Sequence, residues 1–193
     1  MPNWIRNKVI VKGKNAVEEM KKYISLGEYD NVEFFDFEKI DKCPEELTNT
    51  VKGTDTPKEV YEHNLKTYGY ESWYEWRCDH WGCKWNSCSF RYEENGTDEI
   101  TLYYETAWDP SRQAIRTLSS KHKDFEFIIS WSDENFPYYE GDAKYTNGTC
   151  VYEIKYKGGS KEAFEHGFKL WDNEDEYIFN EELGTYQYKE DYE

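Results

Sequence analysis

The chain lacks any apolar run approaching about 18 residues, the length that marks a membrane-spanning helix. Its first residues, Met1 to Asn7, also lack the basic region and apolar stretch of a secretory signal. Cysteine is scarce and odd in number, with five residues in 193, which argues against a secreted disulfide framework. These absences predict a protein of the cytoplasm that has no membrane partner.

Basic residues are outnumbered, since 24 Lys and Arg face 40 Asp and Glu and leave a net charge of −16. Direct binding of duplex DNA is therefore not expected. Acids dominate residues 172–193, which predicts an acidic C-terminal segment after a single domain of residues 1–171. The segment is either a solvated face or a partner-binding surface that imitates a nucleic-acid backbone. The second interpretation assigns partner binding to Asp172, Glu174, Asp175 and Glu176.

Aromatic residues are abundant at 19%, and four of the eight tryptophans lie between Trp73 and Trp85. A tryptophan ring either fills a core or grips a partner. On one helix, Trp81 would lie far round from Trp73 and Trp76, because each residue turns the chain by roughly 100°. We therefore expect a break near Gly82, with Trp76 and Trp81 in the core and Trp85 more exposed.

Periodicity predicts the remaining elements. Strands are expected at 7–12, 87–92, 99–108, 125–131, 138–145 and 150–156, helices at 15–25, 57–68, from about 71, 109–122 and 160–166, and an extended segment at 34–40. The order predicts an α+β, ferredoxin-like fold, in which a split βαβ antiparallel sheet carries helices on one face. A helical insertion is expected at about 44–85.

Four segments carry a resemblance to a known family. They are Met1-Pro2-Asn3-Trp4, Phe35–Ile40 with Pro44–Leu47, Trp76-Arg77 with Trp81–Asn86, and Glu105–Pro110. The chain resembles the YubB/Api92-like family of phages, plasmids and other mobile elements. The resemblance implies a ferredoxin-like fold and a mobile-element origin, but it implies no reaction, because the family has no established activity.

A ligand-binding site is predicted at Arg77, Lys84, Trp85, Trp108 and Arg112. Rings that stack on a base and cations that pair with a phosphate would suit a nucleotide-like ligand. Trp108 precedes an expected helix start at Asp109-Pro110, so it is a candidate for the edge of such a site.

Catalytic and metal chemistry have weaker support. Cys78, Cys83 and Cys88 are separated by four residues each, at the edge of the Cys-x₂₋₄-Cys spacing of structural zinc sites, and His80 is the one histidine nearby. We predict no metal site and no cofactor. The first hypothesis is a non-enzymatic accessory protein that binds a host protein or sequesters a nucleotide-like ligand, as a counter-defence factor. The alternatives are an acidic nucleic-acid mimic and an enzyme with a Cys/His site; the oligomeric state stays open.

Overall fold

A computed structural model describes residues 2–29, 31–53 and 56–189 of the chain. Met1 and residues 190–193 of the predicted acidic segment lie outside the described residues. The elements follow one another as β1 (Trp4–Lys12), α1 (Ala16–Lys21), β2 (Ile24–Leu26), β3 (Glu33–Phe35), α2 (Phe37–Ile40), α3 (Glu45–Thr48), α4 (Lys58–Tyr68), α5 (Trp73–His80), β4 (Cys88–Glu94), β5 (Glu99–Ala107), α6 (Arg112–Lys121), β6 (Glu126–Asp133), β7 (Gly141–Thr146), β8 (Thr149–Lys155), α7 (Lys161–Trp171), η1 (Glu174–Glu176), β9 (Tyr177–Asn180) and β10 (Thr185–Tyr188).

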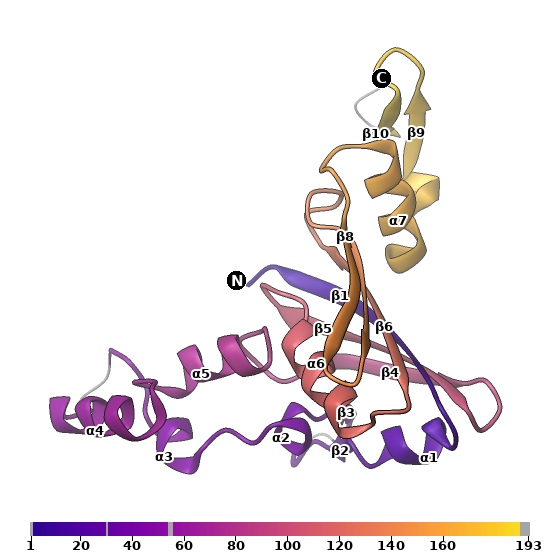
Figure 1. Cartoon of the computed structure of the whole chain (residues 1–193). Coiled ribbons are helices and arrows are strands. Elements are labelled where there is room, and N and C mark those ends of the chain that lie inside the picture. Colours follow the sequence, from indigo (N-terminus) through magenta and orange to yellow (C-terminus); the bar gives the residue numbers. More distant parts are fainter. Residues whose placement is uncertain (1, 30, 54–55, 190–193) are drawn as a thin grey trace.

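Six strands form one antiparallel sheet in the order β4-β5-β1-β6-β7-β8 (Figure 1). The first strand of the chain lies inside this sheet, because β1 pairs with β5 on one side and with β6 on the other. Helix α1 follows β1, and α6 joins β5 to β6. The path β1-α1-β4-β5-α6-β6 is the split βαβ order, so the predicted ferredoxin-like, α+β fold is confirmed.

One face of the sheet packs against helices. Alternate residues of β1, such as Val9 and Val11, are fully buried, as the two-residue period of a strand requires. They share one core with Met20 of α1 and with Ile115 and Leu118 of α6. Helices α1 and α6 therefore cover the same face, as predicted.

The opposite face is partly covered by α7, which lies outside the ferredoxin-like path. Arg6 and Ser132 are neighbours on β1 and β6. The Arg6 guanidinium donates to the carbonyl oxygen of Leu170 at 3.2 Å and lies 4.1 Å from the centre of the Trp171 ring. The Trp171 indole donates to the Ser132 hydroxyl at 2.7 Å. These contacts fix the C-terminal end of α7 against the sheet.

The predicted insertion at about 44–85 contains α3, α4 and α5, which extend to one side of the sheet (Figure 1). None of the helices within residues 2–29, 31–53 and 56–189 combines the length and apolar character that crossing a membrane requires.

The acidic segment forms a hairpin as far as residue 189. Strands β9 and β10 pair, and their rings face α7. Tyr177 lies 5.4 Å from both Phe164 and Phe168, and Tyr186 lies 5.0 Å from Phe168, measured between ring centres. Aromatic packing therefore fixes this segment to α7, while the predicted domain boundary at residue 171 stays a prediction.

Three predicted elements were wrong in part. The helix expected at 15–25 ends at Lys21, because the Tyr23 carbonyl accepts a hydrogen bond from the Asp36 backbone at 2.7 Å and pairs this segment with β3. The extended segment at 34–40 contains α2, whose start is capped by the Asp36 side chain. The helix expected to end at His166 continues to Trp171, where tertiary contacts with Arg6 support its last turn.

A buried ionisable cluster joins α7 to the strands β7 and β6. The two ring nitrogens of His166 lie 3.5 Å from Glu140 and 3.2 Å from Asp142, and Glu140 is only 2% exposed. Burial by itself lowers the pKa of His166, but the hydrogen bond to Asp142 and the nearby Glu140 carboxylate outweigh it and raise that pKa above 6.5. Burial also raises the pKa of Glu140. Both shifts favour the protonated groups in the folded protein.

We predict that His166 makes the free energy of unfolding fall as the pH rises above its unfolded pKa of 6.5. The contribution of His166 is complete below its unfolded pKa of 6.5 and is lost as the pH passes its higher folded pKa. Urea titrations between about pH 6 and pH 9 would measure this slope, and His166→Gln should flatten it. An equal slope in both proteins would contradict the assignment.

Candidate functional site

Helix α5 ends where the sequence predicts a break. Trp81 caps the helix, and Gly82 follows with a φ of 88°, a left-handed conformation that favours glycine. A Cβ on Gly82 would lie 2.9 Å from the carbonyl oxygen of Pro110. The close approach of this turn to the chain before α6 therefore excludes a side chain at residue 82.

Trp81 anchors the turn in the core. Its side chain is fully buried, and its indole donates to the Asp41 carbonyl at 2.8 Å. Its ring centre lies 5.8 Å from that of Phe37 and 6.0 Å from that of Trp76, which is itself 5% exposed. The prediction that Trp76 and Trp81 belong to the core is confirmed.

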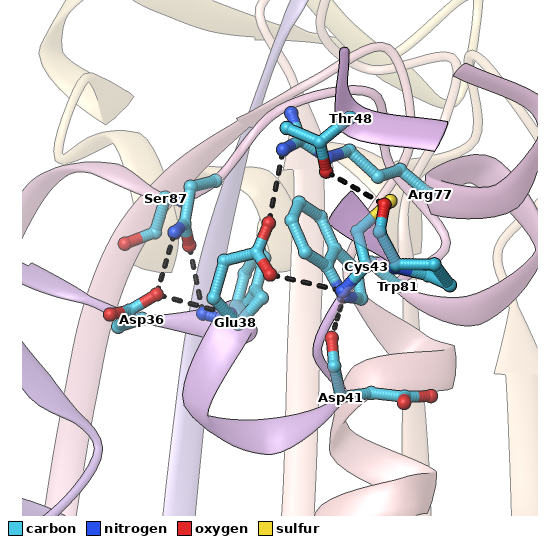
Figure 2. A network of polar contacts seen from close by, with 11 residues as sticks. Asp36, Glu38, Asp41, Cys43, Thr48, Arg77, Trp81 and Ser87 are labelled. Carbon is cyan, nitrogen blue, oxygen red and sulfur yellow. Dashed lines mark hydrogen bonds and ion pairs between the residues drawn. The ribbon is translucent and has the colours of Figure 1, made fainter. Parts of the chain in front are cut away.

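A polar network fixes the chain that follows the turn (Figure 2). The Asn86 side chain donates to Asp36 at 2.8 Å and accepts from the Phe37 backbone at 2.9 Å. The Ser87 hydroxyl donates to the Phe35 carbonyl at 2.8 Å. Residues 86–87 are thereby tied to the segment 35–37, and the intervening residues 84–85 lie between two fixed points.

Between those points, Lys84 and Trp85 take part in a surface cluster that we call the aromatic rim, made of Trp4, Tyr74, Lys84, Trp85 and Trp108. The Lys84 ammonium lies 4.5 Å from the Trp85 ring centre and 4.4 Å from the Trp108 ring centre. Trp4 lies 6.2 Å from Trp85, and Tyr74 lies 6.2 Å from Trp108. Trp85 is 37% exposed and Trp108 41% exposed, which confirms that both are more exposed than Trp81.

The sheet determines where the rim forms. Trp4 begins β1 and pairs with Ala107, the last residue of β5. Trp108 follows with a φ of 73°, and its backbone N–H donates to the Asn3 carbonyl at 2.8 Å. The start of β1 and the end of β5 therefore place Trp4 and Trp108 at the same end of the paired strands.

The rim carries the positive charge of Lys84, which is unusual on so acidic a chain. Within the described ranges, the Lys84 ammonium forms no ion pair with a carboxylate. Its neighbours are ring faces, each worth about 0.5–1 kcal/mol as a cation–π contact at an exposed site. The ammonium is thus positioned beside two accessible indoles and is available to an anionic group.

The two predicted arginines lie in other contacts. Arg77 pairs with Glu38 at 3.0 Å and lies 4.6 Å from the Trp81 ring centre, so it belongs to the network of Figure 2. Arg112 pairs with Glu153 at 2.6 Å, on the side of α6 that faces β8. The structure brings Lys84, Trp85 and Trp108 together without these arginines, whose binding role stays a prediction.

The predicted acidic surface is exposed. Asp172 ends α7, and Glu174, Asp175 and Glu176 form the short η1 turn before β9. All four residues are exposed, and none forms an ion pair with a described residue. Their role in partner binding stays a prediction.

The three cysteines of residues 78–88 are poorly suited to nucleophilic chemistry. Burial raises the pKa values of Cys78, Cys83 and Cys88, and Cys83 is fully enclosed. His80 is committed elsewhere, since it bonds Asp41 at 2.9 Å and stacks on Trp76. A raised pKa opposes the thiolate that nucleophilic chemistry needs. No group of three or more potential metal ligands occurs in the part of the chain that the structure describes.

Sequence reasoning missed two members of the rim. Trp4 is far from Trp85 in the chain, and only the pairing of β1 with β5 brings the two together. Tyr74 follows Trp73 on α5, and its ring meets Trp108 edge to face. The alternation of β1 could have indicated that Trp4 points away from the buried face, since Ile5 is on that face.

Comparison with known proteins identifies the family. A family model described as "Ferredoxin-like domain in Api92-like protein" matches residues 80–188, which is more than half of the chain. The chain belongs to the Api92-like family. The predicted resemblance to Api92-like proteins is thus confirmed, although the match begins near the end of α5 and leaves out the central strand β1. A phage or mobile-element origin stays a prediction.

A solved Api92-like structure has the same fold. Protein api92 from Yersinia pseudotuberculosis superposes with a TM-score of 0.52 at 10% sequence identity, covering 82% of this chain and 99% of that one. A search of curated proteins found no match. The comparisons therefore establish family and fold.

We predict that the neighbouring tryptophans differ sharply in their contribution to stability. Trp81→Ala should lower the free energy of unfolding by about 3–5 kcal/mol, because it leaves a large cavity in the core. Trp85→Ala should cost less than about 1 kcal/mol, since that ring is partly in solvent. Chemical denaturation of both variants would measure the difference, and similar losses would contradict the division into core and rim.

Proposed function

We propose that this Api92-like protein is a non-enzymatic binding protein of a phage or other mobile element. It acts in the cytoplasm of a bacterial host and binds a host protein through the aromatic rim, as a counter-defence factor. The observation that carries the proposal is the Lys84 ammonium between two exposed indoles, with no carboxylate partner in the described chain.

The composition of the rim supports a binding role. Tryptophan and tyrosine are enriched at the centres of protein interfaces, where large rings exclude water from polar contacts. Trp85 and Trp108 supply the rings, and Lys84 supplies a charge that an acidic side chain of the partner would neutralise. The polar network behind the rim holds Lys84 and Trp85 in place before binding, which lowers the entropy lost on association.

The position of the rim away from the five best-formed cavities favours a protein over a small ligand. Small molecules bind in concave sites that enclose most of their surface. Five cavities of about 190–540 Å³ occur in the described structure, and none of these five is lined by Trp85 or Trp108. A nucleotide-like ligand would instead stack on an open indole and pair its phosphate with Lys84.

The exposed acidic turn supports a second candidate function. Asp172, Glu174, Asp175 and Glu176 carry four charges without an ion-pair partner among the described residues. Such a surface would attract a basic nucleic-acid-binding protein and occupy its site by mimicry.

We predict that the rim carries partner affinity. Host proteins captured from a bacterial lysate would be identified by mass spectrometry, together with any bound small molecule. The dissociation constant of the purified partner or ligand would then be measured for each variant. Trp85→Ala and Trp108→Ala should each raise it at least about 10-fold.

The matched control for the rim is Tyr29→Ala, because Tyr29 is 98% exposed and lies between β2 and β3. This variant should bind as the unmodified protein does. Normal binding by both tryptophan variants would overturn the role of the rim.

Binding through the exposed acidic turn predicts a different result. Neutralising Asp172, Glu174, Asp175 and Glu176 to Asn or Gln retains the hairpin, whereas deletion would remove rings that pack on α7. The neutral variant should lose affinity and salt dependence together, because charge attraction is screened by salt. Titrations at low and high salt would measure both, and unchanged affinity would exclude the acidic surface.

A further inference from the structure

The two edges of the six-stranded sheet differ in a way that bears on self-association. Strand β4, at one edge, carries Arg91, Glu93 and Glu94 and is interrupted between Cys88 and Arg91, where Ser89 has a φ of 51°. Charges and bulges of this kind keep an edge strand from pairing with another chain. The edge formed by β4 is therefore protected.

Strand β8, at the other edge, has a register shift at Val151, but it pairs regularly with β7 from Tyr152 to Lys155, where Glu153 and Lys155 alternate with Tyr152 and Ile154. All seven residues are exposed, including Val151 at 58%, Tyr152 at 40% and Ile154 at 46%. An edge strand that is long, exposed and apolar presents unpaired backbone groups to any strand that can align with it.

We propose that β8 pairs with β8 of a second copy of this chain, antiparallel and about a two-fold axis at Ile154. The result is a homodimer with one continuous sheet. This inference is independent of the partner-binding role of the aromatic rim.

The backbone of β8 fits this register. The Tyr156 N–H donates to the Glu140 carbonyl at 3.1 Å, toward β7. Because hydrogen-bonding directions alternate along a strand, the groups of Ile154 also point toward β7, and those of Glu153 and Lys155 point outward. A two-fold axis at Ile154 brings the outward groups of Glu153 opposite those of Lys155 from the second copy.

Side chains favour the same register on both faces. Within the chain, Glu153 pairs with Arg112 at 2.6 Å and with Lys155 at 3.3 Å. On the face of α6, Glu153 also meets Lys155 of the second copy, so each Lys155 can pair across the axis as well as within its own chain. On the other face, Ile154 meets its own copy, and Tyr152 lies opposite Tyr156. A register shifted to centre on Tyr152 would place Glu153 opposite Val151 and lose both ion pairs across the axis.

Charge complementarity gives the first test. Sedimentation velocity over a range of concentrations, at about 0.15 M salt, should show a monomer–dimer equilibrium. Lys155→Glu should raise the dissociation constant at least about 10-fold, because like charges then face each other across the axis. Lys66→Glu, on the exposed α4, changes the net charge equally and should leave it unchanged.

Two results would overturn the dimer in this first test. One is a monomer at every concentration. The other is equal weakening by Lys155→Glu and Lys66→Glu, which would reflect general repulsion between copies of net charge −16.

A disulfide provides the second test and fixes the register. With Cys150 replaced by Ser, Ile154→Cys should cross-link the two copies on oxidation, because facing residues of a non-hydrogen-bonded pair have Cα atoms about 4.5 Å apart. Tyr152→Cys in the same background should stay monomeric on a non-reducing gel, since its copies lie roughly 13 Å apart. Cross-linking through residue 152 instead of 154, or through neither, would overturn the proposal.

Discussion

The pairing of β1 on both of its edges is the constraint on which the rest of the structure depends. This first strand joins β5 to β6, so the centre of the sheet is complete only after β6, which ends at Asp133, has been placed. Its buried residues pack against α1 and α6 in the core. The ring of its first residue, Trp4, contacts the ring of Trp85. The fold and the candidate site therefore share one cause: a central strand contributed by the start of the chain.

Burial of one tryptophan exposes another. Trp81 is enclosed by Phe37 and Trp76, and Gly82 turns the chain beside Pro110 where no Cβ fits. After the buried Cys83, residues 84–85 pass over the surface before Asn86 returns to the network around Asp36. The change of backbone direction at Gly82 thus divides the tryptophan-rich segment. Trp76 and Trp81 lie in the core before the turn, and Trp85 lies in the aromatic rim after it.

The C-terminal segment separates rings from charges in a similar way. Tyr177 and Tyr186 face α7, whereas Glu174 and Asp175 are exposed. The segment is acidic and yet folded as far as residue 189, because aromatic packing outweighs the repulsion of solvated carboxylates. Figure 1 places this hairpin and α5 at different parts of the molecule, so the acidic surface and the rim are separate candidates for binding.

The sequence by itself determined the elements whose signals are local. Periodicity predicted the strands of the sheet, such as β5, and the angles between tryptophans predicted the break at Gly82. Only the tertiary structure decided which cations join the tryptophans. Lys84 lies with Trp85 and Trp108, while Arg77 and Arg112 pair with Glu38 and Glu153 from distant segments. Ion pairs and strand pairing between distant residues produce no periodic pattern in a single sequence. Their partners and geometry could therefore be found only from the folded structure.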